Sequence, residues 1–220
     1  MNSTLRVRLA TTPEQTARLQ SLQRAFAELC NALAPVVQET RCWNRVALHH
    51  LAYRSLRERF PEMGSQMVCN AIHSVSRTCR LVYQHPRSPW SVSVRPGRPL
   101  PLIRFLPGSP VYFDRHTLSF KNGRVSMYTL GGRMRFDLKL RPQDEERFRH
   151  QKLCEIVLSQ SAKSYKLGFT FSPDEVAPSD PGLRKAAPGM PKYLKIIAPG
   201  GSGARMSSFR SSSARVPEEA

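Results

Sequence analysis

The sequence lacks any uninterrupted apolar run of about 18 residues, the minimum that a membrane-spanning helix needs. Its first residues, from Met1 to Arg8, contain no apolar core of a secretory signal peptide. Cysteine is also scarce: five occur, at positions 30, 42, 69, 79 and 154, and none forms a Cys-x-x-Cys pair. This spacing excludes a zinc ribbon and a disulfide scaffold. We therefore expect a cytoplasmic protein whose cysteines are small packing residues in a reducing compartment.

The common catalytic motifs are also missing from the sequence. It has no Gly-rich phosphate loop, no Gly-x-Ser-x-Gly and no His-Glu-x-x-His. Its carboxylates are dispersed, because Asp114 and Asp137 lie in expected strands and the acidic run 144–146 is typical of a helix start. His49 and His50 are adjacent, so on a helix they point about 100° apart and cannot chelate one metal as an i, i+4 pair would. We expect no catalytic residue, no metal site and no cofactor.

Positive charge is what the sequence has in excess. The 220 residues include 34 Lys and Arg against 16 Asp and Glu, which gives a net charge of +18. A protein with this balance is expected to bind a polyanion, and nucleic acid is the leading candidate. Only seven of the basic residues lie in the segment 172–220, so the basic surface is expected within residues 1–171.

The segment 172–220 differs in composition from the rest. It contains seven prolines and the stretches 200–203 and 211–213, which are rich in Gly and Ser. Such a segment has too little apolar content to offset the entropy of ordering it. We expect a disordered or aberrant C-terminal tail from residue 172 onward.

Residues 13–86 show helical periodicity in three successive stretches. The first follows Thr12-Pro13-Glu14-Gln15, a helix start with a capping residue and an early proline, and Pro35 is a candidate distortion within it. The second spans about 44–59, with Ala47, Leu48, Leu51 and Leu56 expected to face inward. The third follows Gly64 and stops before Pro86. The pattern predicts a three-helix domain.

The remaining residues up to 171 show strand periodicity, with apolar and polar side chains alternating. The expected strands are 5–9, 111–113, 117–120, 125–130, 134–140, 156–158 and 165–171, and the turn signals between them include Lys121-Asn122-Gly123. Because one strand precedes the helices, we expect it to complete a sheet formed by the later strands. The expected fold is α+β: a small meandering antiparallel sheet or barrel of residues 1–12 and 87–171 with the helical domain 13–86 inserted.

Cations on these elements are the candidate binding groups. Between Arg41 and Arg59 only Glu58 is acidic, which favours a phosphate-binding helix face over an ordinary solvated one. The candidate nucleic-acid-binding residues are Arg6, Arg8, Arg45, His49, Arg54, Arg57, Arg77, Arg80, Arg104, Arg115, Lys121 and Arg133. The aromatic residues among the strands have two interpretations, stacking on bases or packing in a barrel core, and core packing is the stronger for most of them.

Three stretches of the sequence, in order, support a family resemblance. These are residues 11–15, the passage 47–61 with the helix 65–80, and the β segments 111–120 and 125–133. Together they resemble the OrfB/TnpB family encoded by bacterial insertion sequences. The resemblance implies a wedge-like β-barrel interrupted by a helical recognition domain. It also implies RNA-guided function, since full-length members are DNA nucleases related to type V CRISPR effectors, with base pairing to the guide specifying the target.

The sequence departs from that family after residue 171. The family's nuclease domain has three metal-binding carboxylates and a four-cysteine zinc motif, and neither occurs here. We therefore expect a truncated or frameshifted fragment, or a naturally short accessory protein. It would bind guide-type RNA, with duplex DNA left open as a second partner, and would not cleave by itself. It would reside in the bacterial cytoplasm, at the nucleoid if DNA-bound, without binding membranes. Two alternatives stay open: one subunit of a split RNA-guided endonuclease with a separately encoded nuclease domain, and a non-functional transposase remnant.

Overall fold

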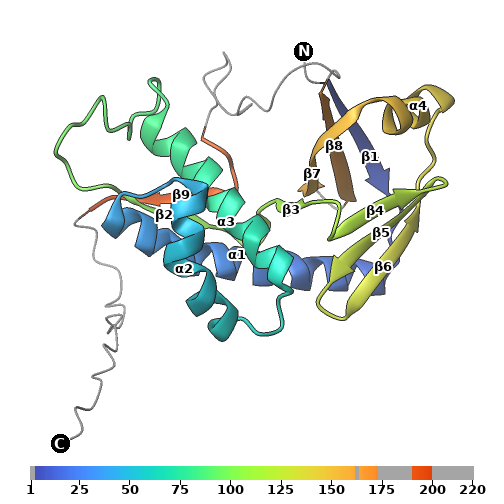
Figure 1. Ribbon diagram of the computed structural model, residues 1–220, viewed down its shortest axis with the longest axis horizontal. Coiled ribbons are helices and arrows are strands. Elements are labelled where there is room, and N and C mark those ends of the chain that lie inside the picture. The colour runs from blue at the N-terminus through green and yellow to red at the C-terminus, as the bar shows by residue number, and fades with distance from the viewer. Residues whose placement is uncertain (1–2, 162–163, 173–189, 200–220) are drawn as a thin grey trace, which may run out of the picture.

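The computed structural model of the protein describes residues 3–161, 164–172 and 190–199 (Figure 1). It is a mixed α+β structure with antiparallel sheets. The helices are α1 (Pro13–Thr40), α2 (Arg45–Arg59), α3 (Ser65–Cys79) and α4 (Pro142–His150), and a π-helix, η1 (Arg80–Gln84), continues α3. The strands are β1 (Ser3–Leu9), β2 (Leu102–Phe105), β3 (Val111–Phe113), β4 (Leu118–Lys121), β5 (Arg124–Thr129), β6 (Gly132–Asp137), β7 (Lys152–Ser161), β8 (Ser164–Ser172) and β9 (Leu194–Ile197). In this described part of the chain, every helix is too short or too polar to span a membrane.

Helix α1 begins as its sequence predicts. The Thr12 hydroxyl accepts a hydrogen bond from the Gln15 backbone N–H at 3.2 Å, and the Gln15 side chain accepts one from the Thr12 N–H at 3.0 Å. This reciprocal capping satisfies two backbone donors that a helix start otherwise leaves unpaired. The helix runs through Pro35 and ends at Arg41, whose φ of 53° is left-handed. Figure 1 shows that α1 extends along both the helical side and the β side of the molecule.

Helix α2 starts at Asn44, whose side chain accepts hydrogen bonds from the N–H groups of the next turn. Its buried stripe is Leu48, Ala52 and Leu56, at spacings of four residues. The prediction that Leu51 faces inward is wrong, since that side chain is 56% exposed. Leu51 lies about 100° around the helix from Ala52, so the two cannot share the narrow buried stripe.

The strands form three sheets, in the orders β1-β8-β7-β3, β4-β5-β6 and β2-β9. Antiparallel pairing is as expected, but among the described residues hydrogen bonds do not join these sheets into a closed barrel. The hairpin between β4 and β5 turns at Asn122 and Gly123, with φ values of 50° and 70°. Two successive positive φ values are the requirement of a type I′ hairpin turn, which explains the Asn-Gly pair.

Strand β1 pairs with β8, from Ser3 opposite Phe171 to Leu9 opposite Tyr165. The prediction that the first strand completes a sheet formed by later strands is thereby confirmed. The apolar residues of β1, among them Leu5 and Leu9, point toward the core, whereas Arg6 and Arg8 are exposed.

Strands β2 and β9 were not predicted, and β9 corrects the expectation of a disordered tail for Leu194–Ile197. The two strands pair antiparallel, and Ile103, Phe105 and Leu194 are buried. Asn31 of α1 accepts from and donates to the Phe105 backbone at 2.7 and 2.9 Å, which fixes β2 against the helix. The expected tail otherwise lies outside the described residues, except for Ser172 and residues 190–193 and 198–199.

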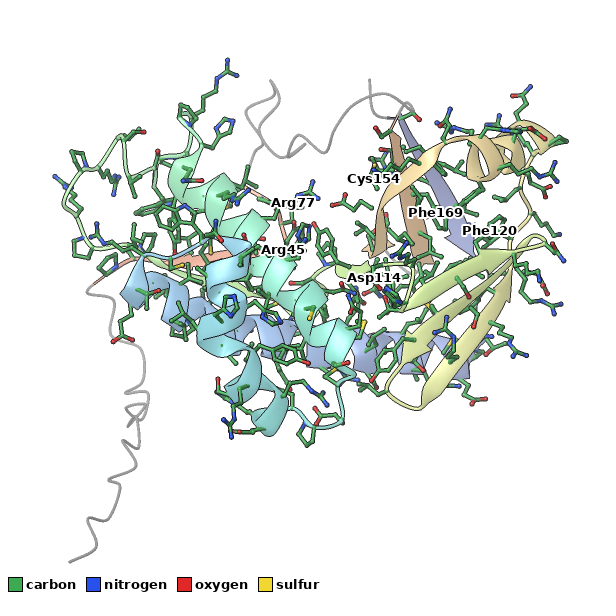
Figure 2. The ribbon with its side chains drawn as sticks, viewed as in Figure 1. Arg45, Arg77, Asp114, Phe120, Cys154 and Phe169 are labelled. Atoms are coloured by element: carbon green, nitrogen blue, oxygen red, sulfur yellow. The ribbon has the colours of Figure 1, made fainter. Side chains whose placement is uncertain are left out.

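An aromatic cluster fills the space between the two larger sheets and α4. Phe148 of α4 contacts Phe120 of β4, with ring centroids 4.2 Å apart, and packs edge-on against Phe169 and Phe171 of β8, each at 5.0 Å. Figure 2 shows Phe120 and Phe169 on the β side of the molecule. This cluster joins the four-stranded and three-stranded sheets without hydrogen bonds between their strands.

Candidate nucleic-acid interface

The solvent-facing side of the β4-β5-β6 sheet carries several cations. Strand register places Lys121 beside Arg124, Arg124 beside Asp137, and Ser126 beside Arg135. We name this surface the basic sheet face: Ser119, Lys121, Arg124, Ser126, Arg133, Arg135 and Asp137. Four of these residues are cationic and one is acidic. All but Ser126 are exposed, because the alternation of each strand turns the neighbouring apolar side chains into the core.

The cations of the basic sheet face differ in the hydrogen bonds and ion pairs that they form within the protein. Arg133 donates to the Ser126 hydroxyl at 2.9 Å and to its carbonyl at 2.6 Å, with longer bonds to His116 and Ser119. Arg124 forms an exposed ion pair with Asp137 at 2.8 Å, which raises the pKa of its guanidinium through a hydrogen bond. Within the described part of the chain, Lys121 and Arg135 have neither an ion pair nor a side-chain hydrogen bond. These two cations are available to phosphate without losing an internal contact.

The predicted cations of α2 do not form one face. Arg45 and Arg54 are nine residues apart and therefore lie about 180° apart around the helix. The Arg54 side chain is 94% exposed, and its one ion-pair partner among the described residues is Glu58, at 3.2 Å. Arg57 donates a hydrogen bond to the carbonyl of Met63, which links α2 to the segment before α3. His49 stacks on Tyr53, with ring centroids 4.5 Å apart.

Arg77 of α3 is engaged inside the protein. Its guanidinium pairs with Glu155 of β7 and lies 5.8 Å from the centre of the Tyr112 ring of β3. In Figure 2 it lies on the side of α3 that faces the strands. Arg77 therefore joins the helices to the four-stranded sheet, a structural role that its position on a cationic helix did not predict. Arg80, one turn later, lines a groove with Arg41 and Trp43.

The remaining predicted cations are exposed on other surfaces. Arg8 of β1 lies opposite Lys166 of β8, and Arg104 of β2 lies opposite Lys195 of β9. Arg6 is on the same face of β1 as Arg8, and Arg115 is in the turn before β4. The structure therefore places Lys121 and Arg133 on one sheet face, and Arg6 and Arg8 on one strand face, but distributes the other candidates over separate surfaces.

Most strand aromatics pack rather than face solvent. Phe105 and Phe113 are 2% and 4% exposed, and Phe120 belongs to the aromatic cluster. The Tyr128 hydroxyl, on the basic sheet face side of β5, is hydrogen-bonded to the segment between α2 and α3. The guanidinium carbon of Arg95 lies over the ring of Trp90, 4.6 Å from the centre of that ring.

Two cations of the basic sheet face, Arg124 and Arg135, were absent from the predicted set. The sequence does indicate Arg135, because it lies two residues from the predicted Arg133 in one strand, and residues at that spacing share a face. Arg124 required the hairpin register, which the Asn122-Gly123 turn determines. Alternation alone could have found Arg135.

The dispersed carboxylates are engaged in local structure. Asp114 accepts hydrogen bonds from the Thr117 N–H at 3.0 Å and hydroxyl at 2.8 Å, and from the Gln66 side-chain amide. Among the described residues there is no group of three or more His, Cys, Asp or Glu side chains placed to hold a metal ion. Comparison of the chain with known protein-family models and with curated proteins found no match.

Proposed function

We propose that this protein binds RNA through the basic sheet face, without cleaving it by itself. The observation that supports this is the array of four cations, against a single carboxylate, on one exposed face of a three-stranded sheet. Exposed cations on a rigid sheet can follow a phosphate backbone, and each neutralised phosphate releases a counterion. The serine hydroxyls among them offer further donors to phosphate oxygens or ribose hydroxyls.

The sequence resemblance extends this proposal to a biological setting. We propose that the chain is an OrfB/TnpB-like protein of a bacterial insertion sequence, binding guide-type RNA in the cytoplasm, with duplex DNA as a second ligand to be tested. The order of elements supports the resemblance, since a strand precedes the helices and pairs with a strand that follows them. The aromatic cluster between the two larger sheets is compatible with a barrel-like β-domain of residues 1–12 and 87–171, with the helices of 13–86 inserted.

The test compares two variants that lose the same charge. Lys121→Gln/Arg135→Gln removes the two unengaged cations of the basic sheet face, and Lys152→Gln/Lys192→Gln removes two exposed lysines elsewhere. Fluorescence anisotropy with a structured RNA hairpin and with a DNA duplex is measured over a salt series. We expect the first variant to bind RNA at least about tenfold more weakly, with the salt slope reduced by roughly two.

The control variant should retain RNA affinity within about twofold, because diffuse charge contributes little at moderate salt. RNA recovered intact after incubation with Mg²⁺ is the expected result for binding without cleavage. Equal losses in the two variants would mean that net charge alone attracts RNA, and the proposed interface would then be wrong. Unchanged urea unfolding curves confirm that the comparison concerns binding.

A further inference from the structure

A groove opens where the linker between α1 and α2 meets the end of α3 and the π-helix η1. Its volume is about 510 Å³, and its lining residues are Arg41, Cys42, Trp43, Asn44, Arg80 and Gln84. This volume is within the range of roughly 300–1,000 Å³ that small-molecule sites occupy. The groove is separate from the basic sheet face, since its lining comes from helical elements and the linker between them.

The charged residues that line this groove are both arginines. Arg41 and Arg80 both line it, and none of the six lining residues is acidic. Arg41 adopts a left-handed backbone conformation, with φ of 53°, at the end of α1. A non-glycine residue in this conformation carries a conformational cost, and such strain clusters at functional sites. Its guanidinium donates to the Arg98 carbonyl at 3.1 Å, which orients the side chain.

Two arginines beside one groove suit an anion with several oxygen acceptors. The planar guanidinium forks bind phosphate oxygens in pairs. A guanidinium has five N–H donors, so each arginine can hold phosphate as well as another acceptor. Phosphate is therefore the anion that the lining favours.

Trp43 adds an aromatic wall beside the two arginines. Its ring is half-buried and contacts Tyr83 at a centroid distance of 5.7 Å and an angle of 45°, and the Ser76 hydroxyl donates to its carbonyl at 2.6 Å. These contacts restrain a ring on which a base could stack. Asn44 and Gln84 contribute amide groups, and the Asn44 side-chain oxygen is already used to cap α2. The π-helix that carries Arg80 and Gln84 is a backbone feature frequent at functional sites.

We propose that this groove binds a nucleoside monophosphate unit, with the base against Trp43 and the phosphate between Arg41 and Arg80. Phosphate alone would leave the aromatic wall and most of the volume unused. The unit can be a free nucleotide or one unpaired nucleotide of an RNA, since both present the same chemistry. In its RNA form this inference rests on the proposed function, with the groove holding one nucleotide and the basic sheet face holding backbone.

The first experiment uses the full chain with Trp90→Phe, which leaves Trp43 as its single tryptophan. Adenosine monophosphate is the probe, and Trp43 fluorescence is the readout. We expect saturable quenching, with adenosine and inorganic phosphate each binding at least about tenfold more weakly, since either lacks half of the contacts. Arg41→Gln and Arg80→Gln should each weaken nucleotide binding at least about tenfold, whereas Arg24→Gln, at an exposed arginine on α1, should not.

A five-nucleotide oligoadenylate distinguishes the two sources of the ligand. Binding at least about tenfold tighter than the mononucleotide, with the same dependence on Arg41 and Arg80, identifies an RNA nucleotide. Equal affinity identifies a free nucleotide. The inference is overturned if neither ligand changes Trp43 fluorescence at millimolar concentration, or if both bind the two arginine variants unchanged. Competition by inorganic phosphate against the nucleotide, measured on the Trp90→Phe protein, tests phosphate recognition even where an arginine variant does not fold.

The two proposals can fail independently. Lys121→Gln/Arg135→Gln should lose affinity for the RNA hairpin and keep the quenching by mononucleotide. If that variant keeps hairpin affinity while the mononucleotide still binds wild type, the sheet interface is wrong and the groove stands. If it loses hairpin affinity while the mononucleotide does not bind wild type, the groove is wrong and the sheet interface stands.

Discussion

The hydroxyl of Tyr128 accepts a hydrogen bond from the backbone N–H of Gly64 at 3.0 Å and donates one to the carbonyl of Glu62 at 2.9 Å. A Cβ atom on Gly64 would lie 3.4 Å from the Tyr128 ring, so the ring packs closely against this backbone. A single side chain of β5 thus connects the three-stranded sheet to the segment between α2 and α3. Together with the hydrogen bonds from Arg18 of α1 to Thr129 and Gly131, Tyr128 connects the basic sheet face to the helices.

Tyr128→Phe should lower the free energy of unfolding by about 1–2 kcal/mol, because it leaves a backbone N–H and a carbonyl without their partner. Urea unfolding followed by circular dichroism measures this. Tyr53→Phe is the matched control, since Tyr53 packs on His49 through its ring, and it should change stability by less than about 0.5 kcal/mol. Equal effects of the two variants would contradict the structural role of the Tyr128 hydroxyl.

Phe148→Ala should destabilise the protein by about 2–4 kcal/mol, because Phe148 contacts three other rings between the two larger sheets. Since Phe148 is half-buried, the lower part of that range is expected. Leu51→Ala, at an exposed position of α2, is the control and should have little effect. A loss below about 1 kcal/mol for Phe148→Ala would mean that α4 is not needed to hold the sheets together.

Arg77→Gln and Arg54→Gln should affect different properties. Arg77→Gln breaks the contact with Glu155 and should lower the thermal unfolding midpoint by a few degrees. Arg54→Gln removes only an exposed pair with Glu58, so stability should stay within about 0.5 kcal/mol of wild type. Differential scanning calorimetry separates the two. If Arg54→Gln proved the more destabilising, the assignment of Arg77 as the linking residue would be wrong.

Asp144→Asn should show a pH-dependent loss of stability. The hydrogen bond from Arg141 holds the pKa of the Asp144 carboxyl below its ordinary value, although burial of the carboxyl opposes this. The unfolded chain therefore binds the proton first as pH falls, and the stabilisation is complete above a pH of about 4 and is lost below it. Urea titrations at pH 6 and pH 3 should give a larger difference from wild type at pH 6. Glu58→Gln, at an exposed carboxylate, controls for lost charge, and a difference that stayed constant with pH would contradict this account.

The cysteines should differ in reactivity. Burial raises the pKa of the Cys30 and Cys79 thiols, so little thiolate forms there at neutral pH, whereas Cys154 is exposed. A thiol-reactive probe followed by peptide mass spectrometry should modify Cys154 within minutes and leave Cys30 and Cys79 unmodified until the protein is unfolded in urea. Rapid labelling of Cys79 in the native protein would show that α3 is not packed as described.

The elements that could be predicted are those determined by a few neighbouring residues. The capping pair at Thr12 and Gln15 identifies the start of α1 because both hydrogen bonds lie within one turn. The Asn122-Gly123 turn identifies the β4-β5 hairpin because few other residues adopt two successive positive φ values. That β1 joins a sheet of later strands also followed from its isolation, since a single strand needs a sheet to join, but its partner β8 did not.

The features that could not be predicted depend on distant packing. Strand β2 forms because Asn31 of α1 bonds to its backbone and because β9 pairs with it. Both partners lie far from β2 in the chain. The burial of one stripe of α2 depends on α1 and α3, so periodicity alone allowed Leu51 to be placed inside. Likewise, nothing in the local sequence distinguishes Arg77, engaged by Glu155, from an arginine that is available to a ligand.

The pairing of β1 with β8 has a consequence for synthesis on the ribosome. Leu9 leaves the ribosome more than 150 residues before its partner Tyr165. At roughly 5–20 residues per second, β1 waits on the order of 10–30 s without a strand to join. During that time Arg6 and Arg8 place charge on the open strand, which discourages it from pairing with another nascent chain.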